Sequence, residues 1–280
     1  MKILFCGDLV GRAGRDVALE YLPALRADMA LDFVVVNAEN AAHGFGLTQK
    51  ICEELFEAGA DAITTGNHVW DQREVIPFVD ADHRVLRPLN YTGGTPGRGA
   101  SVIKARDGRS VLVVNVMCRL FMELLDDPFA AVDGVLKNHP IGHAVDAVLI
   151  DVHGEATSEK MALGHVCDGR ASLVVGTHTH VPTADAQVLP GGTAYQSDAG
   201  MCGDYDSVIG MQKETAVAKF RTKIVTERLA PARGPASLCG TYVETDDETG
   251  LATRVAPVIL GGRLRPAWPE FLPPRKTTPE

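Results

Sequence analysis

Short apolar runs rich in branched residues recur along the first two thirds of the chain, at residues 3–6, 33–36, 61–64, 147–150 and 173–175. Runs this short and this apolar are typical of strands buried on both faces of a sheet. Helical patterns lie between them, so strand and helix alternate. The alternation predicts crossover units and a largely parallel sheet.

Three of the helical patterns begin with recognisable start signals. Capping side chains at such positions accept hydrogen bonds from backbone N–H groups that a first helical turn leaves free. The predicted starts are Thr48, in a pattern that ends at Gly59, Asp71, with Glu74 in capping-box spacing, and Asp127, which is followed by Pro128.

Two further segments have the pattern of β-hairpins. The first joins residues 100–105 to residues 110–117 through Asp107-Gly108, and the second joins residues 238–245 to residues 251–260 through a polar turn. Such hairpins add antiparallel strands. The predicted fold is therefore an α/β sandwich of mixed, largely parallel sheets flanked by helices.

The chain has 280 residues, 45% of them hydrophobic, which suffices for one large core. We expect a single domain over residues 1–262. Residues 263–280 are rich in proline, which breaks regular elements, and we expect this tail to be extended or disordered. Its prolines are Pro266, Pro269, Pro273, Pro274 and Pro279.

The net charge is −9, so the sequence gives no sign of a broad basic face for duplex nucleic acid. Any anionic substrate must be attracted locally, and bound cations are a simple way to do this. The first apolar stretch, residues 3–6, is too short for a signal peptide or a membrane span. We expect a cytoplasmic protein without a membrane partner.

Six cysteines are scattered without a C-x-x-C pair. This spacing argues against a zinc ribbon, a thioredoxin-type redox site and a small disulfide scaffold. We expect buried free thiols.

Residues that commonly bind metals follow the ends of the apolar runs. The carboxyl ends of strands are where sites form in open α/β sheets, so we expect these side chains to meet on one edge of a single sheet. Carboxylates, carboxamides and imidazoles gathered there predict a two-metal hydrolytic centre suited to phosphate esters. The candidates are Asp8, Glu39, Asn40, Asn67, His68, His153, His178 and His180.

Each candidate taken alone has an ordinary structural alternative. Asp8 could cap the next helix, and Asn67 with His68 could form a polar turn. His178 and His180 could alternate on an exposed strand end, although two imidazoles on one face directly after a buried run favour a metal.

Taken in order, five short blocks resemble those of the calcineurin-like metallophosphoesterase superfamily. Within that superfamily the chain is most similar to the YmdB family of bacterial 2′,3′-cyclic-nucleotide phosphodiesterases, over residues 1 to about 262. The blocks are Gly7-Asp8, Asn37-Ala-Glu39-Asn40, Gly66-Asn67-His68, Asp151-Val-His153-Gly154 and Gly176-Thr-His178-Thr-His180.

The resemblance implies two metal sites that share Glu39. The first site would take Asp8, Glu39, Asn40 and His180, and the second Glu39, Asn67, His153 and His178. Most superfamily members carry histidine where this chain has Val10, and aspartate where it has Glu39. Asn40 is the natural substitute for the missing imidazole, and both departures are of the YmdB type.

Mixed oxygen and nitrogen ligation without thiolate indicates two divalent or trivalent ions. This ligation suits iron, manganese or zinc better than copper(I) or an iron–sulfur cluster. We expect iron or manganese, with zinc or magnesium as alternatives. Two divalent ions, two carboxylates and a hydroxide make a site that a phosphodiester monoanion brings to neutrality, whereas a phosphomonoester dianion leaves surplus negative charge. This balance favours diesters.

We expect a hydroxide that bridges the metals to attack phosphorus, and His68, to which the resemblance assigns the proton donor, to protonate the departing alkoxide. The alternative for His68 is that it only orients a ligand. The resemblance supplies 2′,3′-cyclic nucleotides, and with them RNA ends, as substrates.

Two other functions stay open, a phosphomonoesterase and a regulatory protein that binds nucleotide or RNA with little turnover. The sequence does not assign a role to His43, or to Tyr205 and Asp206. Apolar hairpins at a sheet edge invite pairing, so we also expect a homo-oligomer.

Overall fold

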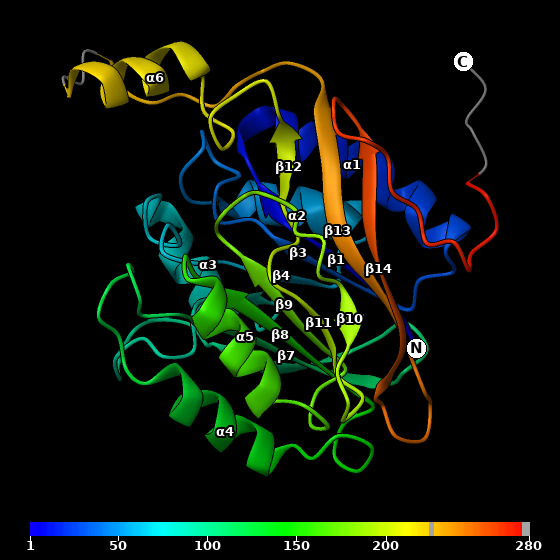
Figure 1. Cartoon of the computed structure of the whole chain (residues 1–280). Helices are drawn as coiled ribbons and strands as arrows, with labels where there is room; N and C mark the ends of the chain where they lie inside the picture. The colour runs from blue at the N-terminus through cyan, green and yellow to red at the C-terminus, as the bar shows by residue number, and fades with distance from the viewer. Residues whose placement is uncertain (224–226, 276–280) are drawn as a thin grey trace.

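The computed structural model describes residues 1–223 and 227–275. Over these residues, two sheets pack face to face between two layers of helices (Figure 1). The predicted α/β sandwich of mixed, largely parallel sheets is confirmed.

The larger sheet has the strand order β2-β12-β13-β1-β3-β4-β5, with β14 paired to β13. Strands β1, β3, β4 and β5 run parallel to one another, whereas β13 is antiparallel to β1, β12 and β14. The strands are β1 (Lys2–Cys6), β2 (Asp8–Leu9), β3 (Phe33–Asn37), β4 (Ala62–Thr64), β5 (Val85–Leu86), β12 (Met201–Asp204), β13 (Ala236–Thr245) and β14 (Ala252–Gly261).

The smaller sheet has the order β10-β11-β9-β8-β7-β6. Its middle strands β7, β8, β9 and β11 are parallel, and an antiparallel strand lies at each edge. The strands are β6 (Ala100–Lys104), β7 (Ser110–Met117), β8 (Ala147–His153), β9 (Leu173–Thr177), β10 (Gln187–Val188) and β11 (Ala194–Gln196). Both predicted hairpins, β6–β7 and β13–β14, are confirmed.

The period-two alternation of the strands divides the core into layers. In β1, Ile3 and Phe5 face the other sheet, whereas Leu4 and Cys6 face the helices. The described helices are α1 (Gly11–Asp28), α2 (Gln49–Ala58), η1 (Arg73–Val75), α3 (Ile76–Ala81), α4 (Pro128–Asn138), α5 (Thr157–Val166) and α6 (Lys213–Thr222). The first four pack on the larger sheet, and α4 and α5 pack on the smaller one.

Two of the three predicted helix starts are confirmed. The Thr48 hydroxyl accepts from the N–H of Ile51, and the Asp127 carboxylate accepts from the N–H groups of residues 129 and 130. The capping box at Asp71 is wrong. The chain there forms a 3-10 turn whose first residues have no side-chain cap, because the Asp71 carboxylate pairs with His68 instead.

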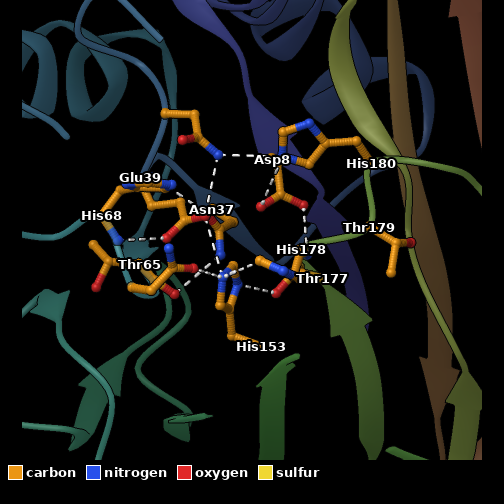
Figure 2. Close-up of polar contacts among 12 residues, drawn as sticks. Asp8, Asn37, Glu39, Thr65, His68, His153, Thr177, His178, Thr179 and His180 are labelled. Atoms are coloured by element: carbon orange, nitrogen blue, oxygen red, sulfur yellow. Dashed lines mark hydrogen bonds and ion pairs between the residues drawn. The ribbon is translucent and has the colours of Figure 1, made fainter. Parts of the chain in front are cut away.

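The expectation of a single sheet edge is also wrong. Strands β1, β3 and β4 belong to the larger sheet, whereas β8 and β9 belong to the smaller one. Apolar runs reveal buried strands but not their partners, and the β6–β7 hairpin starts a second sheet. Because the sheets are stacked, their carboxyl ends still meet at one end of the sandwich (Figure 2).

Residues 263–275 carry no helix and only one bridge, between Ile259 and Ala267. Trp268 and Leu272 in this segment pack against the core on the helix side. The rest of the predicted tail, residues 276–280 with Pro279, lies outside the described residues. No described helix combines the length and the apolar character that crossing a bilayer demands. All six cysteines are buried and free, as expected.

Candidate metal centre

The candidate ligands come from five segments that end at the same end of the sandwich. Asp8 lies in β2, Glu39 and Asn40 follow β3, and Asn67 with His68 follows β4. His153 is the last residue of β8, and His178 and His180 follow β9. Figure 2 shows the side chains of Asp8, Glu39 and His153 pointing toward one another from both sheets.

The first group is formed by Glu39, Asn67, His153 and His178. Nε2 of His153 lies 3.2 Å from Oε1 of Glu39, 3.0 Å from Oδ1 of Asn67 and 3.1 Å from Nδ1 of His178. Glu39 and His153 are fully buried, and His178 is half-buried. These are the residues that the resemblance assigns to the second metal.

The second group is formed by Asp8, Glu39, Asn40 and His180. One potential ligand atom from each of Asp8, Glu39 and His180 lies within 4.8 Å of the other two. Glu39 also belongs to the first group, where the same limit holds for Glu39, His153 and His178. Its carboxylate therefore stands between the two groups, where a bridging ligand must stand.

Thr177 determines which nitrogen of His153 faces the cluster. The Thr177 hydroxyl donates to Oδ1 of Asp151 at 2.6 Å, so it must accept from Nδ1–H of His153, 2.9 Å away. Nε2 of His153 is therefore the atom that faces inward. A buried side chain that fixes the ring in this way is the usual support of a metal-binding histidine.

His178 is oriented in a similar way. Its Nε2 lies 3.4 Å from the Glu155 carboxylate, which favours the hydrogen on Nε2 and directs the Nδ1 lone pair inward. The first group then holds a carboxylate oxygen, an amide oxygen and two imidazole nitrogens, which all accept hydrogen bonds. Acceptors that face one another under burial need a shared proton or a bound cation between them.

Asp8 gives a second sign that the site suits a cation. Its Oδ2 accepts from the backbone N–H of His178 at 3.1 Å, but its Oδ1 is buried without a hydrogen-bond partner in the part of the chain that the structure describes. Nε2 of His180 lies 3.9 Å from this oxygen. A buried, unpaired carboxylate oxygen is costly unless it binds a metal ion, so these residues fit a metal.

The pKa values of the cluster agree with this interpretation. Burial raises the pKa of Asp8. Burial and the neighbouring His153 together lower the pKa of His178 to about 3, which leaves the His178 imidazole neutral. Burial alone would lower the pKa of His153, but the surrounding carboxylates, with Glu39 the strongest, raise it. The cluster thus attracts positive charge, and metal binding would displace the proton that His153 otherwise holds.

Asn40 is placed at the site with its amide nitrogen inward. Its Nδ2 lies 3.1 Å from Oε1 of Glu39 and 3.2 Å from Nε2 of His180. Nδ1 of His180 donates to the carbonyl of Ile209 at 2.7 Å, so Nε2 of this ring carries the free lone pair. Turning the amide of Asn40 by half a rotation would bring its oxygen to the position of a ligand.

His68 lies at the rim of the cluster. Its backbone N–H donates to Oε2 of Glu39 at 3.1 Å, and its Nδ1 lies 2.8 Å from the Asp71 carboxylate. The His68 side chain is 29% exposed, and its ring packs edge-on against Phe45. With Nδ1 held by Asp71, Nε2 is the nitrogen that can exchange a proton with substrate or water.

The loop that carries His178 and His180 is held from below by a buried ion pair. Both histidines have left-handed backbone, with φ of 94° and 66°. The Lys160 ammonium donates to the Thr177 carbonyl and to the Asp198 carboxylate, each at 2.9 Å, and Asp198 also accepts from the N–H and hydroxyl of Thr179. These contacts fix a conformation that is unfavourable for histidine.

Sequence reasoning did not assign a role to four supporting residues, namely Asp151, Lys160, Thr177 and Asp198. Asp151 is fully buried and also accepts from Asn37 and Thr64. The available signal was a carboxylate inside the apolar run of residues 147–153, because a buried carboxylate demands donors. No comparable signal marks Lys160, whose helix has an ordinary polar pattern.

The unassigned loop residues also have definite places. The Tyr205 hydroxyl donates to backbone carbonyls, including that of His180, so it supports the loop from inside. Asp206 is on the surface, where it pairs with Lys213 and Arg263. His43 lines a cavity beside the cluster.

The chain is similar to known proteins over most of its length. The family model described as YmdB-like protein matches residues 4–258. The 2′,3′-cyclic-nucleotide 2′-phosphodiesterase of Bacillus subtilis is 46% identical over 260 residues, which cover 93% of this chain and 97% of that protein.

Two crystal structures are similar over almost the whole fold. A hypothetical protein from Thermus thermophilus matches with a TM-score of 0.87 and 44% identity, covering 94% of this chain and 100% of the other. A protein described as a novel phosphatase from Mycoplasma pneumoniae matches with a TM-score of 0.86 and 33% identity, covering 93% of each chain.

Proposed function

The chain belongs to the YmdB-like family, and we propose that it is a two-metal phosphodiesterase that hydrolyses small phosphodiesters such as 2′,3′-cyclic nucleotides. The proposal places the activity in one domain, residues 1–262. It extends to RNA ends that carry the same cyclic phosphate.

The convergence of acceptor atoms around Nε2 of His153, together with the unpaired Oδ1 of Asp8, is the observation that carries the proposal. We assign Asp8, Glu39, Asn40 and His180 to one metal and Glu39, Asn67, His153 and His178 to the other. When bound, such a pair of metals supplies a water-derived nucleophile at neutral pH and neutralises phosphate charge. Oxygen and nitrogen ligands favour iron or manganese, with zinc or magnesium as alternatives.

His68 is proposed as the general acid. An alkoxide leaves poorly at neutral pH, so the departing ribose oxygen needs a proton. The Asp71 carboxylate orients the ring through Nδ1, and the partly exposed Nε2 can take its proton from solvent. The backbone of His68 bonds to Glu39, which keeps this ring beside the proposed metals.

A His68→Ala variant tests the catalytic role. It should retain two metals by elemental analysis, because the backbone N–H that contacts Glu39 is unchanged, while hydrolysis of 2′,3′-cyclic AMP falls by about 10²–10⁴-fold. Equal turnover in both proteins would remove His68 from the mechanism. If both proteins are inert on every diester, a regulatory binding role is favoured instead.

The diester preference is tested by comparing bis-p-nitrophenyl phosphate with p-nitrophenyl phosphate in the presence of manganese. We expect faster hydrolysis of the diester, because its single negative charge balances the proposed site. Faster hydrolysis of the monoester would make the protein a phosphomonoesterase.

A further inference from the structure

A cavity of about 840 Å³ opens beside the candidate metal centre. Phe45 on its wall packs against the ring of His68, with 5.0 Å between ring centroids. Ala42 and His43, also on the wall, follow the proposed ligand Asn40 by two and three residues. The cavity therefore lies next to the place where the scissile phosphate would bind.

Among the described residues, the cavity is lined by several cations and by no carboxylate. The cations come from the start of α1, from α6 and from the segment before β13, and they are Arg12, Arg15, Lys219, Arg228 and Arg233. Across the described ranges, the side chains of Arg12, Lys219, Arg228 and Arg233 form no ion pair or hydrogen bond, and Arg15 donates only to the carbonyl of Ala41.

Such a cluster does not serve folding. Like charges around one cavity repel one another. The chain has a net charge of −9, so acidic residues that could pair with these cations are plentiful. Arg12, Lys219, Arg228 and Arg233 are all exposed and free to move toward a ligand. Unpaired cations that face one cavity indicate an anionic ligand with several charges.

The scissile phosphate does not account for that charge. The proposed metals already balance a single phosphodiester, so five further cations call for further phosphates. The cavity volume lies near the upper end of the range for small-molecule sites, which is roughly 300–1,000 Å³. A cationic groove with an aromatic ring, here Phe45, is the arrangement that binds single strands, with phosphates on the cations and bases on the ring.

We propose that this cavity binds the nucleotides that precede the scissile phosphate, an inference that rests on the proposed function. The preferred substrate is then a short single-stranded RNA that ends in a 2′,3′-cyclic phosphate. Figure 1 shows α6, which carries Lys219, standing away from the two sheets. The cyclic mononucleotide would occupy only the metal end of the site.

The test compares kcat/KM for 2′,3′-cyclic AMP, its 5′-phosphorylated form and a ribohexamer that ends in the cyclic phosphate. We expect the hexamer to exceed cyclic AMP by at least about tenfold. Double substitution Arg228→Gln and Arg233→Gln should remove most of that gain and change hydrolysis of cyclic AMP by less than about twofold. The dependence of log kcat/KM on log salt should become shallower by about 0.7 for each lost phosphate contact.

Arg106→Gln is the matched control, because it removes the same charge from an exposed position in the β6–β7 hairpin, outside the cavity. The proposal is overturned if the hexamer is no better than cyclic AMP, if one 5′-phosphate gives the full gain, or if Arg106→Gln has the same effect. If no diester is hydrolysed, the proposed function fails. Binding of a fluorescent ribohexamer then tests separately whether the cavity binds RNA. Loss of affinity in the double variant alone supports RNA binding by the cavity, and equal affinity in all proteins overturns it.

Discussion

The Thr177 hydroxyl lies 2.9 Å from Nδ1 of His153 and connects this imidazole to the buried carboxylate of Asp151. This chain of hydrogen bonds determines which atom donates and which accepts at each step. Asp151 accepts the hydroxyl hydrogen, the hydroxyl oxygen accepts from Nδ1–H, and Nε2 is left for the metal side of the ring. One hydroxyl on β9 therefore orients a ligand on β8.

Thr177→Val keeps the shape of this side chain but removes the hydroxyl. Nδ1 of His153 and Oδ1 of Asp151 then lose a buried partner, and we expect metal affinity to fall by about 10–100-fold. Manganese titration by calorimetry measures the change. Thr177→Ser retains the hydroxyl and should bind nearly as wild type does; unchanged affinity in the valine variant would disprove the orienting role.

Glu39→Ala should lose both metals, because the carboxylate of Glu39 belongs to both ligand groups. Asn67→Ala should lose mainly one, because the side-chain oxygen of Asn67 lies 3.0 Å from Nε2 of His153, in the group assigned to the second metal. Elemental analysis after dialysis distinguishes the two outcomes. Full occupancy in the Glu39 variant would show that this carboxylate does not bridge.

Gly66→Ala should abolish metal binding while the protein still folds. A Cβ at this position would meet Oε2 of Glu39 and Nε2 of His153 closer than a methyl group can approach, so it would fill part of the metal site. Gly93→Ala is the control, since a Cβ there has nothing within 4 Å. A Gly66 variant with wild-type metal content would refute the proposed position of the metals.

Asp198→Ala should destabilise the fold strongly, because it leaves the ammonium of Lys160, which is 1% exposed, without its counter-charge. Loss of one partner of a buried pair costs about 3–5 kcal/mol, measured here by urea unfolding with a chelator present. Asp206→Ala breaks the exposed pair with Lys213 and should leave stability almost unchanged. A similar, small effect of both substitutions would show that the buried pair is not needed for the fold.

Local patterns were enough to predict most of the secondary structure and to name candidate ligands that the fold brings together. The strand predicted at residues 33–36, observed at 33–37, follows from a continuous apolar run, and the caps at Thr48 and Asp127 follow from capping chemistry. Both signals depend on near neighbours. Asp71 was misjudged because its carboxylate has two available partners, and the imidazole of His68 is the one it contacts. That choice depends on where the ring lies in space.

The amino-acid sequence thus predicted the helices, the strands and the candidate metal ligands, because the pattern that marks each of them spans only a few neighbouring residues. The pairing of strands into two sheets, the buried link from Thr177 to His153, and the shared cavity wall of Arg12 and Arg233 all join residues far apart in the chain. Such contacts depend on which surfaces pack together, and no local pattern carries that information. The cationic cavity became visible in the folded chain for this reason, since its charges are dispersed along an acidic sequence.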